Sequence, residues 1–240
     1  MHCYIGCSGF YNKDWKEVFY PKTLAQSKWF EYYCTQFNTL ELNTTFYRFP
    51  TVERLQKWFD KSPADFRFSV KVPRLITHYK QMNSVESLLD DFYSTVSEGL
   101  KEKLGAVLFQ FPSRINYSEE FLQRITQNLN TAFTNVVEFR AVNWWNQHVT
   151  VELAKRNISF SGINIEGLPD EIISNTNTIY YRFHGIPTLY FSQYPSESIH
   201  QFARELKQQA SGITAYIYFN NTATIAAINN ARELESFLAC

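Results

Sequence analysis

The repeating unit of this chain is seen most clearly where a short strand ends in a polar segment, in Thr39-Leu40-Glu41-Leu42-Asn43-Thr44-Thr45-Phe46-Tyr47-Arg48-Phe49-Pro50. Leu40 and Leu42 alternate with Glu41 and Asn43, as in a strand that has one apolar and one polar face. A carboxylate on the hidden face of a strand is costly to bury unless it has a partner. The stretch therefore predicts that Glu41 meets a cation or a hydrogen-bond donor.

The end of this strand predicts a passage from strand to helix. We expect a loop at residues 43–45 and a helix from Val52, with Thr51 as its N-cap. Arg48 lies in this connection. The same passage recurs along the chain, which makes it the repeating unit of the fold.

Seven other segments show strand patterns, and helical patterns separate most of them. These strands are expected at residues 3–7, 66–72, 105–111, 136–140, 158–164, 178–184 and 214–220. Helices are expected near 24–37, 52–59, 85–100, 118–129, 149–156, 196–209 and 221–238, with only a weak one after the sixth strand. Eight units in 240 residues favour an α/β fold, a single (β/α)8 TIM barrel with eight parallel strands, over a doubly wound sheet. No linker interrupts the chain, so residues 1–240 are expected to form one domain.

Composition narrows the class of protein. Lys plus Arg and Asp plus Glu both total 23, so the net charge is zero. A dedicated nucleic-acid binder usually carries an excess of basic residues. The four cysteines, Cys3, Cys7, Cys34 and Cys240, lack zinc-type spacing and do not suggest a disulfide framework. Neither a signal peptide nor a membrane-spanning run is evident. We therefore expect a cytoplasmic protein without membrane contact.

Alternation within the strands predicts a polar barrel interior, concentrated at the C-terminal ends where this fold builds its sites. The inner set with candidate roles is Ser8, Glu41, Asn43, Lys71, Gln110, Glu138, Arg140, Arg182, His184 and Asn220. Its cations outnumber its carboxylates, and Arg48 and Arg74 from loops add to them. Such a site suits a phosphate or carboxylate ligand. The alternative is a purely structural ion network.

Several candidates have two interpretations. His184 is either an acid/base group or a satisfied core histidine, and His78 is expected to be exposed in a loop. The Asn220-Asn221 turn is a candidate phosphate site, although Asn221 or Thr222 could instead cap the last helix. Trp144 could stack on a base or a sugar, and packing at the barrel rim is the alternative.

These residues together resemble the YecE-like family, a barrel family of unassigned function (domain of unknown function 72). The resemblance rests on residues 5–9 with Trp15, 19–21, 41–48, 68–74, 76–78, 108–112, 137–140 with Trp144, 181–185 and 218–221. It implies a TIM barrel related in shape to sugar-phosphate isomerases and apurinic-site endonucleases. The chain departs from the family pattern at Ala141, Ile186 and Thr222, which weakens a catalytic role for those positions.

Two functional hypotheses follow. In the first, the chain is an enzyme for a phosphorylated small molecule or a nucleic-acid end. Lys71, Arg140 and Arg182 hold the anion, and Glu41 or Glu138 acts as acid/base with His184.

In the second, the chain is a non-catalytic barrel that binds nucleic acid or a nucleotide. A glycosidase carboxylate pair and a metal site are disfavoured, because cations crowd both glutamates and the interior has no aspartate. No cofactor or metal is predicted, and the oligomeric state is left open.

Overall fold

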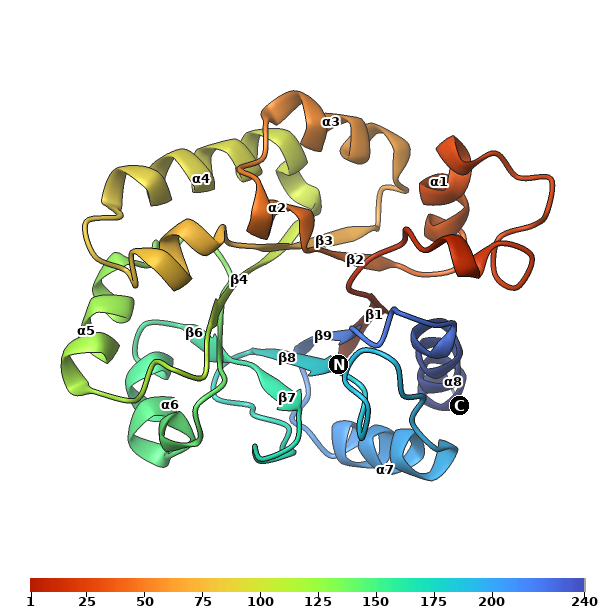
Figure 1. Cartoon of the computed structure of the whole chain (residues 1–240). Helices are drawn as coiled ribbons and strands as arrows, with labels where there is room; N and C mark the ends of the chain where they lie inside the picture. The colour runs from red at the N-terminus through yellow and green to blue at the C-terminus, as the bar shows by residue number, and fades with distance from the viewer. Residues whose placement is uncertain (240) are drawn as a thin grey trace.

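A computed structural model of the chain describes residues 1–239. Its strands are β1 His2–Cys7, β2 Thr39–Leu42, β3 Arg67–Lys71, β4 Leu104–Phe111, β5 Asn135–Phe139, β6 Ile158–Phe160, β7 Gly162–Asn164, β8 Thr178–Phe183 and β9 Thr214–Phe219. Its α-helices are α1 Trp29–Cys34, α2 Thr44–Tyr47, α3 Val52–Lys61, α4 Glu86–Leu100, α5 Glu119–Asn128, α6 Gln147–Ala154, α7 Ser196–Lys207 and α8 Ala226–Ala239. The strands lie at the centre and the helices surround them (Figure 1).

All strands are parallel and form one sheet in the order β6-β5-β4-β3-β2-β1-β9-β8-β7. This nearly closed barrel with intervening helices confirms the predicted α/β, TIM-barrel-like fold. The predicted count of eight strands is one too low, because the sixth strand is divided at Ser161. Its first half pairs with β5 and its second half with β8, so one continuous segment bridges both neighbours.

Most predicted helices are present, and Thr51 caps α3 as expected by accepting from the backbone N–H of Arg54. Three connections differ from the prediction. Residues 44–47, expected mainly as loop, form α2, and a π-helical turn occupies Leu75–Tyr79. The last helix begins at Ala226, so neither Asn221 nor Thr222 caps it. Its N-terminus is therefore displaced along the chain from the turn that ends β9.

The barrel interior is apolar in its lower part and polar towards the C-terminal ends of the strands. The apolar part is a cluster of Ala106, Leu108, Val136, Tyr180, Tyr216 and Tyr218, with Tyr4 packed against it. The Tyr218 hydroxyl lies 2.6 Å from Thr39 Oγ1 and donates to Ser69 Oγ at 2.8 Å. This layer closes the barrel from below and forms the floor of the polar region.

Among residues 1–239, none of the helices combines the length and the apolar character that a membrane span requires.

Candidate functional site at the barrel mouth

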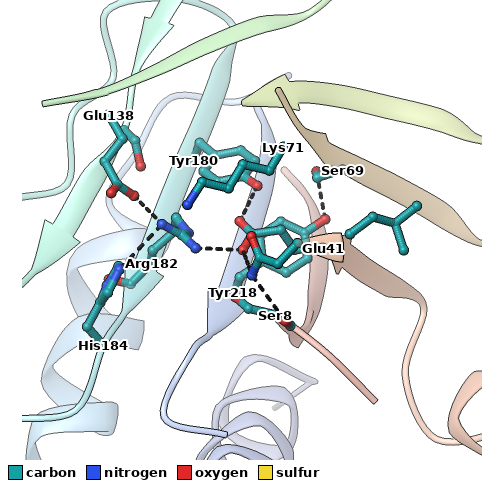
Figure 2. Close-up of polar contacts among 12 residues, drawn as sticks. Ser8, Glu41, Ser69, Lys71, Glu138, Tyr180, Arg182, His184 and Tyr218 are labelled. Atoms are coloured by element: carbon teal, nitrogen blue, oxygen red, sulfur yellow. Dashed lines mark hydrogen bonds and ion pairs between the residues drawn. The ribbon is translucent and has the colours of Figure 1, made fainter. Parts of the chain in front are cut away.

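Arg182 is the centre of the polar interior. It comes from β8 and is 1% exposed, with Nη2 2.7 Å from Glu41 Oε1 and Nη1 paired with Glu138 Oε2. Figure 2 shows the guanidinium between the two carboxylates, which belong to β2 and β5. Burial would raise the pKa of the Glu138 carboxyl, but Arg182 and Arg140 outweigh burial and hold it well below its usual range. Both glutamates are therefore held beside Arg182, and the Glu138 carboxyl stays ionised.

Arg140 joins this network just after β5. Its Nε lies 2.9 Å from Glu138 Oε1, and its Nη2 lies 3.0 Å from Nε2 of His184. Burial, and next the charge of Arg182, lower the pKa of the fully buried His184 well below its usual range. A neutral His184 donates from Nδ1 to the Arg182 carbonyl at 3.3 Å and accepts at Nε2 from Arg140. His184 thus orients Arg140.

The Glu41 carboxylate also accepts hydrogen bonds from two other side chains. The Tyr180 hydroxyl donates to Oε2 at 2.6 Å, and Asn43 Nδ2 donates to Oε1 at 3.0 Å. The same amide nitrogen donates to the Ser8 carbonyl at 3.1 Å, which links the ends of β1 and β2. Glu41 is thereby held by two residues of β8 and by the asparagine that follows its own strand.

Lys71, at the end of β3, is a different kind of cation. The residue is 8% exposed, and its Nζ lies 4.1 Å from the centroid of the Phe46 ring. Burial, then Arg182, lowers the pKa of the Lys71 amine to about 7, against the opposing effect of Glu138. Thr45 in α2 donates to the Lys71 carbonyl at 2.6 Å, which holds α2, and with it Phe46, against this strand end.

A cavity of about 630 Å³ opens above this network. It is lined by Ser8, Asn43, Phe46, Tyr47, Lys71, Arg74, His78, Tyr79, Gln110, Pro112, Ser113, Arg114, Arg140, Arg182, Tyr190 and Asn220. These residues follow or end strands β1 to β5, β8 and β9, so the cavity is the C-terminal mouth of the barrel. Five lining residues are lysine or arginine, and none in the described chain is aspartate or glutamate.

Two polar groups on the cavity wall have no hydrogen-bond partner among residues 1–239. They are the Ser8 hydroxyl and the Asn43 carbonyl oxygen, and the Nε of Arg182 is a third such buried atom. A buried polar atom without a partner costs free energy, so such atoms favour a ligand or water that satisfies them. The hydroxyl and Nε–H suit an anionic oxygen, and the amide oxygen suits a ligand hydroxyl.

The structure brings most predicted site residues to one place, with six exceptions. Glu41, Glu138 and His184 belong to the buried network and do not line the cavity. Arg48 is exposed and also outside the lining. Trp144 is fully buried, stacks on Phe139 with centroids 4.0 Å apart and donates to the Ile115 carbonyl, so it is a core residue.

Asn221 was predicted to bind the ligand, but it lies outside the cavity lining. Its Nδ2 donates to the Ser192 carbonyl at 2.9 Å and to Asn230 Oδ1 at 3.2 Å. It links the loop after β8 to α8 and does not line the cavity. Its neighbour Asn220 does line the cavity.

Sequence reasoning missed several lining residues, chiefly Phe46, Tyr47, Tyr79, Arg114 and Tyr190. Arg114 had a usable signal, because it follows the Pro112 that ends β4. The tyrosines come from α2, the π-helical turn and the loop after β8, which have no periodic pattern.

His78, expected to be exposed, is half-buried in the cavity wall. Burial, and next Lys71 and Arg114, lower the pKa of His78 to about 4. Its depressed pKa reflects its burial first and the positive charge of this wall second. Within the described chain no three His, Cys, Asp or Glu residues are placed to hold a metal ion.

The sequence matches to known proteins agree on one family. The sequence profile described as "Protein of unknown function DUF72" matches residues 4–240. The UPF0759 protein YunF of Bacillus subtilis is 24% identical, over 98% of this chain and 94% of YunF. The UPF0759 protein YecE of Escherichia coli K12 is 27% identical, over 56% of this chain and 49% of YecE.

Solved structures agree on the fold. A DUF72 family protein from Thermotoga maritima is 27% identical with a TM-score of 0.89, covering 100% of both chains. D-psicose 3-epimerase from Clostridium cellulolyticum H10 is 12% identical with a TM-score of 0.53, covering 100% of this chain and 97% of its own, a likeness of fold alone.

Proposed function

Because the chain belongs to the DUF72 family, whose description states no reaction, we propose from the mouth cavity that it binds an anionic, phosphate-bearing ligand there. The proposal rests on the positive charge of the residues that line the cavity. Lys71, Arg74, Arg114, Arg140 and Arg182 line it, and the described residues add no carboxylate to it. Such a wall in a protein of zero net charge concentrates positive potential at one place.

Part of that charge is already compensated, and part is not. Glu41 and Glu138 balance Arg182 and Arg140 within the ion-pair network. Lys71, Arg74 and Arg114 have no ion pair among residues 1–239. The two arginines therefore supply the surplus, and Lys71, whose pKa is about 7, adds its charge at lower pH. Arg74 lies over the rings of Tyr47 and Tyr79, and Arg114 donates to the His78 carbonyl.

The ligand class we propose is a phosphorylated small molecule that also carries hydroxyl groups. The arginines provide planar donors for phosphate oxygens, and the Asn43 carbonyl oxygen accepts from a hydroxyl. The proposal extends to an enzyme for a phosphoester or sugar phosphate, acting as one domain in the cytoplasm. In it Glu41, Glu138 and His184 position Arg182 and Arg140, in place of the acid/base role expected from sequence.

A thermal melt tests the anion site. At about 100 Kd of phosphate, a binding protein gains about 2.7 kcal/mol, or roughly 5–10 °C in Tm at this size. We expect this shift in wild type and its loss in the double variant Arg74→Ala/Arg114→Ala. Both residues are exposed, so the variant is expected to fold.

The matched control removes two exposed arginines away from the mouth, in Arg156→Ala/Arg204→Ala. This variant has the same net charge and should keep the full phosphate shift. Chloride at equal ionic strength should give no shift. Equal shifts with chloride, or a full phosphate shift in the mouth variant, would contradict the proposal.

One observation favours a second candidate function, binding of a nucleotide or nucleic-acid end without catalysis. Tyr47 and Tyr79 are 70% and 62% exposed at the cavity rim, and Tyr190 is also exposed there. Exposed aromatic rings beside cations are typical platforms for bases. The dependence of oligonucleotide binding on salt separates this candidate from the first.

A further inference from the structure

Two buried lysines in this chain differ sharply in what surrounds their amines. Lys103 Nζ donates to the Phe59 carbonyl, the Ser62 carbonyl and the Ser62 hydroxyl at 2.6, 2.7 and 3.0 Å. All three of its N–H donors are used, so the ammonium form is held in place, although burial lowers its pKa too. Lys103 therefore serves the structure.

Lys71 has none of these partners. Within the described chain its Nζ has no hydrogen bond and no carboxylate within ion-pair distance, and it lies over the Phe46 ring. Figure 2 shows the amine near Arg182 and without an interaction to the residues drawn. The amine lines the mouth cavity, while Arg140 and Arg182 crowd it with positive charge. A desolvated amine beside other cations is the setting in which lysine acts as a nucleophile.

We propose that Lys71 forms an imine with the carbonyl carbon of an anionic aldehyde or ketone bound in the mouth cavity. The inference rests on the proposed anion site, because the anionic group of the substrate would be held by the arginines of the same wall. Beyond anion binding, the inference names the carbonyl carbon of the ligand as the atom that reacts. Its basis is the place of an unpartnered amine on a cationic cavity wall.

The step balances without any additional reagent. The Nζ lone pair attacks the carbonyl carbon, and the carbon–oxygen π electrons move to oxygen. One amine proton moves to this oxygen to give a carbinolamine. The hydroxyl then leaves with the second amine proton as water, and a carbon–nitrogen double bond forms. A pKa of about 7 for Lys71 leaves much of the amine neutral at pH 7, as attack requires.

Reductive trapping tests this inference on the intact protein. Glyceraldehyde 3-phosphate and its neutral analogue glyceraldehyde serve as matched probes, and cyanoborohydride reduces any imine to a stable secondary amine. Peptide mapping by mass spectrometry then locates the adduct. We expect one dominant adduct at Lys71, formed about tenfold or more faster with the phosphorylated probe, which corresponds to ~1.4 kcal/mol of anion binding.

Lys103 is the control within the same molecule and should stay unlabelled. Lys71→Met should lose the dominant adduct, and inorganic phosphate should slow labelling of wild type by competition. Labelling should rise with pH through about 7, following the neutral amine. The rate at Lys71, measured in wild type, keeps the test valid even if the variant folds poorly.

The outcomes separate the two proposals. Phosphate-dependent stabilisation without an adduct at Lys71 overturns the imine and leaves the anion site intact. Equal labelling by both probes, or adducts spread evenly over exposed lysines, also overturns the inference, since it is stated for an anionic carbonyl. Absence of both the adduct and the phosphate shift overturns both proposals.

Discussion

Arg182 places a positive charge in the middle of the barrel, where an unpaired cation would be strongly unfavourable. Glu41 and Glu138 compensate it from opposite sides. Breaking a buried pair by removing one partner costs ~3–5 kcal/mol, whereas replacing the whole set by apolar residues is often neutral. The ion pairs alone therefore add little net stability, which is consistent with the proposed role of the network in positioning Arg140 and the Nε of Arg182.

The titration of Lys71 makes the free energy of unfolding depend on pH. Its pKa falls from 10.5 in the unfolded chain to about 7 in the folded one, mainly through burial. Between these values the unfolded state binds more protons, so this residue makes stability rise with pH, by up to ~1.4 kcal/mol per pH unit. Below about pH 7 its charge is a full cost to the folded state. We therefore expect Lys71→Met to be more stable than wild type at pH 6, with an advantage that shrinks towards pH 10.

Urea unfolding of both proteins from pH 6 to pH 10 measures this difference. Taking the difference between the two proteins cancels the other titrating groups. An advantage of Lys71→Met that is constant over this range would show that Lys71 does not titrate there.

Alternation along the strands was enough to predict which residues point into the barrel, including Lys71, Glu138 and Arg182. Alternation could not show which cations form ion pairs, because this depends on which side chains can contact one another across the barrel. Arg182 pairs with Glu41 from far along the chain, while Lys71, which also points inward, pairs with no carboxylate of residues 1–239. The same limit applies to Trp144, whose stacking on Phe139 is a tertiary contact.

At the scale of elements, the mouth is built by short segments between strands and helices. The π-helical turn Leu75–Tyr79 contributes His78 and Tyr79, and α2 contributes Phe46 and Tyr47. Segments of four or five residues are too short to show a helical period, which is why the sequence predicted loops there. The long strands and helices, by contrast, were predicted from their periodicity.

The loop after β8 depends on one buried side chain of α8. Asn230 accepts from the Tyr194 backbone N–H at 3.0 Å and donates to the Tyr194 carbonyl at 3.0 Å, and it also accepts from Asn221. This loop carries Tyr190, whose backbone N–H donates to the His184 carbonyl at 2.6 Å. Asn230 thus helps to hold one wall of the mouth.

We predict that Asn230→Ala loosens this wall. The change leaves two buried backbone groups without partners, at ~1–3 kcal/mol each, and should lower Tm accordingly. Hydrogen exchange should speed up at residues 188–195 and stay unchanged in α4. The neighbouring Asn229, which is exposed and donates to Gln193, is the matched control. Equal effects of Asn229→Ala and Asn230→Ala would contradict this account.

Over the whole molecule, equal numbers of acidic and basic residues coexist with a cationic end of the barrel. Composition could not show this, because it averages over the surface, and only the fold gathers the strand ends. The strand-helix alternation did predict the fold, apart from the strand count. The division of the sixth strand at Ser161 comes from pairing with two neighbours in turn, which a single sequence pattern does not record.

Binding of a nucleic-acid end at the mouth cavity would depend on the number of cations that are free to contact phosphates. At pH 6, where the Lys71 amine is charged, three lining cations lack ion pairs in the described part of the chain, namely Lys71, Arg74 and Arg114. Contacts with about three phosphates of a single strand predict a slope of log K against log salt of about −2. We therefore expect a short 5′-phosphorylated oligonucleotide to show a slope of about −2 or shallower, measured by fluorescence anisotropy. Arg74→Ala/Arg114→Ala should bring the slope towards −1, and the oligonucleotide without its terminal phosphate should bind more weakly. A slope of about −5 or steeper, unaffected by that phosphate, would instead indicate a long nucleic-acid track outside the mouth, because only many backbone contacts release so many counterions.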